Sequence, residues 1–314
     1  MTSTLLSLVQ TVQAELNLFP QATSVSGATD DQTIQLFTLI NAVGRELMVE
    51  RDWRSLEEEG IISVIPPVTT TGNTTQQSAV VTGIGSLTGV AATTWVCQGQ
   101  TIAQAARVVS VDSSSQVTLN EQSTATLTGI SLTFSQDTYA IPADFSHFVN
   151  GTAWDRTRRW QLLGPTSPQE DQWMRSGIAA IGPRRRFRQV GRGVNSFRIW
   201  PPPATTDTPS TLVFDYISSY WAQDTNGVPK AAFTADTDTC VYPDDVMIKG
   251  LKYKFFLVKG FDVSTYRAEY MQARDVAMAQ DGGARTVRMG RKRWPVLISG
   301  ANIPDAGFGS ATGS

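Results

Sequence analysis

The residues between 184 and 203 carry the densest group of side chains that could do chemistry. The segment RRRFRQVGRGVNSFRIWPPP holds six arginines and ends on three prolines, although the chain of 314 residues has a net charge of only −2. Guanidinium groups bind phosphates and carboxylates through paired hydrogen bonds. The segment therefore indicates a nucleic-acid contact, an anion site of an enzyme, or a strand whose charge meets another subunit.

Residue types that catalysis commonly needs are scarce. The chain has one histidine, His147, and two widely separated cysteines, Cys97 and Cys240. The sequence contains no GxxxxGK[ST], HExxH or GxSxG motif. The glycines of 83–89 have the wrong spacing for a dinucleotide loop, and Asp244-Asp245 fits a helix start better than a cation site. We therefore expect no enzymatic activity, no cofactor and no metal.

The charge is unevenly divided along the chain. Residues 1–150 contain 4 Lys and Arg against 13 Asp and Glu, whereas residues 151–314 contain 22 against 15. This asymmetry fits a stacking or ring-forming subunit with two differently charged faces, and chance is the plain alternative. No secretion signal is recognisable, and the apolar run 255–258 is far too short to cross a bilayer.

Four segments have the apolar spacing of amphipathic helices: 4–18, 30–53, 244–259 and 263–280. Asp30 and Asp31 stand where they could cap the second of these. A shorter helix is expected near 168–176. The apolar positions expected to pack the helices together are Leu5, Leu8, Val12, Phe37, Ile40, Val43, Leu47, Leu251, Phe255, Tyr266 and Tyr270.

The middle of the chain has strand character. Residues 66–135 are nearly uncharged and alternate apolar with polar side chains, and 112–115 reads as a hairpin turn. Residues 197–200 and 212–217 alternate in the same way, which predicts a hairpin closed by PPPATTDTPS.

These elements predict an α+β fold. A helical bundle is formed by the N- and C-terminal helices, with inserted β-hairpins and a small all-β, sandwich- or barrel-like module. The expected domains are a scaffold of 1–65 and 136–281, the inserted module 66–135, and an extended C-terminal docking arm, 282–314. The arm has no periodicity and carries Arg285, Arg288, Arg291, Lys292, Arg293 and Trp294.

The order of these pieces resembles the head-to-tail adaptor, or tail tubular protein A, of short-tailed bacteriophages of the podovirus type. The resemblance rests on four stretches: LINAVGRELMVERDWRSLEEEG at 39–60, DTYAIPADFSHFV at 137–149, the segment 197–221, and the helix beginning DDVMIKGLKYKFFLVK at 244. No single stretch is diagnostic, and their succession carries the likeness. The 66–135 module departs from the shortest adaptors.

The resemblance implies a virion structural protein, assembled in the host cytoplasm and located in the tail at the portal vertex. Such adaptors form a dodecameric ring that joins the portal protein to the tail nozzle and tail fibres and extends the DNA channel. Genomic DNA would pass through the lumen without sequence-specific binding, and no membrane is involved. The C-terminal arm would reach into the portal.

A pore through which DNA must slide cannot hold many strong cations, because each phosphate contact adds affinity. We therefore expect most of Arg184, Arg185, Arg186, Arg188 and Arg192 to face neighbouring subunits or the acidic face of another ring, with the basic arm as a second interface. A DNA-facing role for one or two of them, or a solvated strand edge, are the alternatives. For the whole protein, the β-module and the eight tryptophans leave open a receptor- or glycan-binding tail component, and an accessory DNA-binding virion protein is the third possibility.

Overall fold

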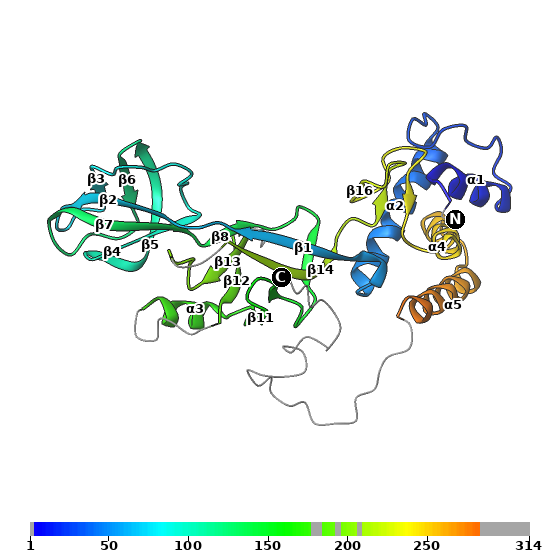
Figure 1. Ribbon diagram of the computed structural model, residues 1–314. Helices are drawn as coiled ribbons and strands as arrows, with labels where there is room; N and C mark the ends of the chain where they lie inside the picture. The colour runs from blue at the N-terminus through cyan, green and yellow to red at the C-terminus, as the bar shows by residue number, and fades with distance from the viewer. Residues whose placement is uncertain (1–2, 177–183, 192–195, 206–208, 283–314) are drawn as a thin grey trace, which may run out of the picture. The chain divides into compact units, whose positions relative to one another are not determined.

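The computed structural model describes residues 3–176, 184–191, 196–205 and 209–282 (Figure 1). The described chain forms two compact units. The first comprises residues within Met1–Glu58, Asp144–Phe148 and Tyr216–Arg291, and the second comprises Glu59–Ala143 and Val149–Asp215.

The first unit is built around helix α4 (Asp244–Lys259), which packs against α1 (Leu5–Glu15), α2 (Asp31–Glu50) and α5 (Ser264–Asp281). The Thr4 side chain caps α1 by accepting from the Ser7 N–H, and Asp30 caps α2 by accepting from the Thr33 N–H at 2.8 Å. Gly260, with φ of 76°, ends α4 in the left-handed conformation that glycine tolerates best. The start of α1 is tied to α4, because Ser3 donates to the Asp244 carboxylate.

Aromatic rings fill the interior of this unit. Trp221 is fully buried, stacks on Tyr242 at 6.0 Å and meets Phe233 edge-on at 5.0 Å. Gly44 of α2 lies against the Trp221 ring so closely that a Cβ there would come within 2.3 Å of it. A short 3-10 helix, Arg54–Leu56, follows Trp53, whose indole N–H donates to the Leu47 carbonyl.

Short strands complete the first unit. Strand β15 pairs with β16 and β17, and β9 pairs with the end of β14. Their bounds are β9 Phe145–Phe148, β14 Ser210–Ser218, β15 Ala222–Gln223, β16 Pro229–Lys230 and β17 Thr239–Cys240.

The second unit contains a closed six-stranded antiparallel barrel in the order β2-β3-β6-β5-β4-β7 (Figure 1). Its strands are β2 Val68–Thr74, β3 Val80–Thr82, β4 Trp95–Gly99, β5 Ile102–Ser113, β6 Gln116–Leu119 and β7 Leu127–Gln136. Alternate side chains such as Leu132 and Phe134 point into a shared apolar interior. Closure leaves the barrel without free strand edges, which suits a polar, weakly charged sequence.

Two further sheets and a helix lie beside the barrel strands in the second unit. One sheet has the order β12-β13-β8, and the other contains β1, β14, β10 and β11. Phe197 of β13 stacks on Phe187 at 4.9 Å and on Phe214 of β14 at 5.4 Å, which joins the two sheets. The bounds are β1 Glu57–Val64, β8 Thr138–Ala140, β10 Trp154–Asp155, β11 Trp160–Gln161, α3 Pro168–Arg175, β12 Arg186–Val190 and β13 Ser196–Trp200.

The predicted fold class was wrong. The described residues form seventeen strands and only five short α-helices, so the protein is mostly β and not a helical bundle with a small β insertion. The helices were conspicuous in the sequence because a 3.6-residue stripe is easy to recognise. The many strands of two to five residues between Glu57 and Cys240 have no comparable signal.

The predicted hairpin of residues 197–217 was also wrong. Strand β13 pairs with β12 and β8, whereas β14 pairs with β10 and β9 in another sheet. The prolines at 201–203 lack N–H donors, so the ladder ends there and the two strands separate. Among the described helices, none is both long and apolar enough to span a membrane.

Candidate functional site: an arginine-lined cleft

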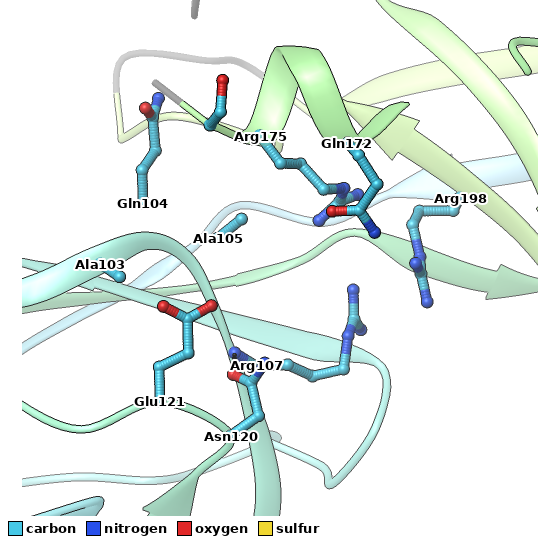
Figure 2. A pocket seen from close by; sticks show the side chains of 10 residues that line it. Ala103, Gln104, Ala105, Arg107, Asn120, Glu121, Gln172, Arg175 and Arg198 are labelled. Atoms are coloured by element: carbon cyan, nitrogen blue, oxygen red, sulfur yellow. Dashed lines mark hydrogen bonds between the residues drawn. The ribbon is translucent and has the colours of Figure 1, made fainter. Parts of the chain in front are cut away.

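A cleft of about 460 Å³ opens in the second unit between barrel strand β5, helix α3 and strand β13 (Figure 2). Three arginines, one from each element, point toward this opening: Arg107, Arg175 and Arg198. Ala105 in the cleft wall has φ of 75°, a conformation that costs an L-residue about 1–3 kcal/mol and that clusters at functional sites. The lining is completed by Ala103, Gln104, Asn120, Glu121, Gln172 and Ser176.

The Asp137 carboxylate lies close to all three of these arginines. It is fully buried and accepts from Arg107 twice, from Nη1 at 3.0 Å and from Nη2 at 2.6 Å. The Thr138 hydroxyl donates to the same carboxylate at 2.7 Å. A paired guanidinium–carboxylate contact fixes both position and orientation, so Arg107 is held rigidly although it stands on a barrel strand.

Helix α3 supplies the second carboxylate. The Ser167 side chain accepts from the Glu170 N–H, and Pro168 occupies the first turn, which together fix where the helix begins. One turn later Arg175 donates to Asp171 at 3.0 Å and to Asp137 at 3.4 Å. Arg175 therefore links Asp171 of the helix to Asp137, which directly follows barrel strand β7.

Two further contacts involve Trp200 and Arg188. Its guanidinium lies over the buried Trp200 ring at 4.7 Å, a cation–π contact. Arg188 of β12 donates to Asp171 at 3.0 Å, so this carboxylate also has two arginine partners. The side chain of Asp171 is only 4% exposed.

Arg198 has the weakest compensation of the group. Its Nε donates to Thr138 at 3.2 Å and lies 3.9 Å from the Asp137 carboxylate. Burial, together with the nearby charges of Arg107 and Arg175, lowers the pKa of Arg198 to about 10. The guanidinium stays charged at neutral pH, in a place where positive charge is unfavourable.

This arrangement of guanidinium and amide groups can bind an anion. In the part of the chain that the structure describes, no group of three or more His, Cys, Asp or Glu side chains could hold a metal ion. The cleft presents guanidinium donors and amide groups, which suit a carboxylate or phosphate.

The structure places three of the five predicted interface arginines in ion pairs within the chain. Arg185 is 5% exposed and donates to Asp155 at 3.4 Å and to Ser210 at 2.8 Å. Arg186 pairs with Glu170, and Arg188 pairs with Asp171 as described. Arg184 is half-buried. A role of these side chains at a subunit interface stays a prediction.

The other predicted residues are the remaining arginine of the run, the basic arm and the helix-packing positions. Arg192 and the arm residues Arg285, Arg288, Arg291, Lys292, Arg293 and Trp294 lie outside the described residues. Phe37 and Tyr266 are half-buried, and Tyr266 stacks on Phe256 at 4.2 Å. The rest are buried in the first unit: Leu5, Leu8, Val12, Ile40, Val43, Leu47, Leu251, Phe255 and Tyr270.

Sequence reasoning missed the network of Arg107, Asp137, Asp171, Arg175 and Arg198. Arg107 gave one usable signal, because it is one of three charged residues in an otherwise uncharged stretch, 66–135. A charge on such a strand needs a partner. The partner, Asp137, lies 30 residues away between strands β7 and β8, and no spacing rule connects the two.

A cleft of guanidinium and amide donors above buried carboxylates is typical of the class of binding proteins. Comparison with known families narrows this class. The family model described as SU10 adaptor protein matches residues 84–294, and the chain belongs to this family. No curated protein matches the chain.

The family confirms the resemblance to a phage head-to-tail adaptor that the sequence suggested. The protein is therefore a structural adaptor of the phage virion, which interacts with other virion components.

Proposed function

We propose that this adaptor joins the portal to the tail nozzle and tail fibres of a short-tailed phage. It forms a ring, dodecameric as in the adaptors it resembles, which extends the DNA channel at the portal vertex. The observation that carries the proposal is the family match over 84–294, which covers parts of both compact units.

Exposed apolar side chains on the first unit support ring formation. Leu257, Val258 and Phe261 at the end of α4 are 47%, 55% and 62% exposed, and they are close neighbours in the chain. Contiguous exposed apolar groups mark protein contact sites. We assign this end of α4 to a contact with the next copy in the ring.

The internal pairing of the arginines supports passage of DNA. Arg185, Arg186 and Arg188 are each engaged with a carboxylate of the same chain. A paired arginine gains little by exchanging its carboxylate for a phosphate, so these residues would not hold DNA fast. The basic arm, 282–314, is the segment we assign to portal docking.

Reconstitution tests the proposal. Purified chain is mixed with purified portal rings, sedimented through a density gradient, and the heavy fraction is viewed by electron microscopy. We expect one additional ring, formed by twelve copies of this chain, on one face of the portal. Failure of the chain to sediment with the portal, or its binding to surface glycans instead, would contradict the proposal.

Two sets of variants separate the contacts. Replacing Val258 and Phe261 by Ser should leave single copies on the portal but prevent the closed ring, because the intersubunit contact is lost. The matched control is Val109→Ser, a 50% exposed valine of the barrel. Replacing Arg291, Lys292 and Arg293 by Gln should abolish portal binding, and unchanged binding would exclude the arm as the docking segment.

A further inference from the structure

Among the residues that the structure describes, the arginines of the cleft outnumber the carboxylates that pair with them. Arg107, Arg175 and Arg198 line the cleft, with side chains 18%, 11% and 21% exposed, and Arg188 shares Asp171 behind them. Four guanidinium groups thus share two buried carboxylates, those of Asp137 and Asp171. Adding Glu121 from the rim still leaves positive charge in excess.

Half-buried cations that repel one another are unfavourable unless an anion joins them. The lowered pKa of Arg198, caused by burial and by Arg107 and Arg175, has the direction expected for such a site. The strained backbone of Ala105 in the same wall is a second, independent sign, because strain of this kind persists where the surrounding structure holds a functional shape.

We propose that the cleft receives one acidic side chain, Asp or Glu, from a neighbouring protein subunit of the virion. Its carboxylate accepts a hydrogen bond from Arg198, the least compensated cation. Arg107 and Arg175 add to the positive electrostatic potential that attracts it. Figure 2 shows Gln172 of α3 facing the same opening as Arg198, where its amide can complete the hydrogen bonding of the incoming group.

A protein carboxylate fits this cleft better than the phosphates of duplex DNA. The side chains of the three lining arginines are at most 21% exposed, so a ligand must enter the cleft to reach their guanidinium groups. A side chain on a flexible segment can enter, whereas duplex phosphates are fixed on the surface of a wide rod. Glu121 at the rim would also repel a polyanion more than a single carboxylate.

The proposal depends on the proposed function only for the identity of the subunit that provides the acid. Its test uses the full chain alone, so it can fail while the portal reconstitution succeeds, and the reverse. The probe is a blocked tri-glutamate peptide, titrated into the chain by isothermal titration calorimetry at low salt. We expect saturable binding to one site; no saturable binding at millimolar peptide would overturn the proposal.

Two variants assign the binding to the cleft. Arg198→Gln removes one cation and leaves Asp137 paired with Arg107 and Arg175, and we expect the affinity to fall about tenfold. Gln172→Glu keeps every arginine and brings a tethered carboxylate to the opening, so it should block the peptide by occupying its place. Gln172 is exposed, and this variant should fold even if Arg198→Gln does not.

The matched control is Arg156→Gln. Arg156 lies in the same unit, is 54% exposed, pairs with Glu59 and does not line the cleft. Its peptide affinity should equal that of the unchanged protein. Equal loss of affinity in Arg156→Gln and Arg198→Gln would show nonspecific attraction. Duplex DNA binding that depends on Arg198 more than peptide binding does would assign the cleft to nucleic acid, and either result overturns the proposal.

Discussion

Replacement of Asp137 by Asn removes the charge on which the cleft is built. The amide keeps the shape of the side chain, but Arg107, Arg175 and Arg198 lose their common carboxylate. Removing one partner of a buried ion pair typically costs about 3–5 kcal/mol. Because the three arginines are 11–21% exposed and partly reach water, we expect the lower end, about 3 kcal/mol.

The two buried cysteines allow this loss to be measured separately in each unit. Cys97 lies in barrel strand β4, and Cys240 lies in β17 of the first unit. Burial raises the pKa of each thiol to about 12, so neither reacts with a thiol reagent near pH 8 until its unit opens. A loss of about 3 kcal/mol corresponds to labelling of Cys97 about a hundredfold faster.

Cys240 is the internal reference, and its labelling rate should not change in Asp137→Asn. The matched variant is Asp112→Asn, an exposed barrel aspartate, for which we expect a much smaller change in the rate of Cys97 labelling. Adding Arg107→Gln to Asp137→Asn should slow Cys97 labelling again, because one uncompensated cation is removed. If Cys97 is labelled no faster in Asp137→Asn than in Asp112→Asn, the Asp137 carboxylate does not stabilise the second unit.

Three further outcomes follow from single contacts. Gly44→Ala should lower the free energy of unfolding of the first unit by about 1–3 kcal/mol, because the new Cβ would overlap Trp221. This loss should exceed the gain from the better helix propensity of Ala, and a higher melting temperature would contradict it. Arg185→Gln should cost about 3 kcal/mol because it leaves Asp155 buried without its cation, whereas Arg184→Gln should cost less than about 0.5 kcal/mol in the same melting experiment. Burial alone would raise the pKa of Asp238, but hydrogen bonds from Lys230, Thr234 and Ala235 together lower it below 3.8. Its stabilising contribution is thus complete above about pH 4 and lost as the pH falls through the folded pKa. Urea unfolding at a series of acidic pH values should therefore show a weaker pH dependence of stability for Asp238→Asn than for the unchanged protein.

The helices could be predicted from the sequence because their signals are local. The stripe of Leu5, Leu8 and Val12 indicates one face of α1, and Asp30 indicates the start of α2, where its side chain accepts from Thr33. The observed helices begin and end within a few residues of the expected ranges. The turn at 112–115 was equally local, and Ser113 pairs with Gln116 there.

Contacts between distant residues could not be predicted in the same way. The pairing of β13 with β8 brings Arg198 to Thr138, and the choice of β8 instead of β14 depends on which strands share a core. The prediction treated the helices as the main architecture and therefore underestimated the β content of the chain. The arginine run was recognised as unusual, yet the partners of Arg185, Arg186 and Arg188 lie on elements with no motif of their own.

A cryo-electron microscopy reconstruction of the portal vertex, in virions that contain this chain, would show whether the protein is located at the portal. We expect a ring of density directly below the portal, into which the six-stranded barrel and the four helices of the first unit can each be fitted. The DNA lumen should pass through this ring. Density for the barrel only at the tips of tail fibres, with no copy in contact with the portal, would contradict it.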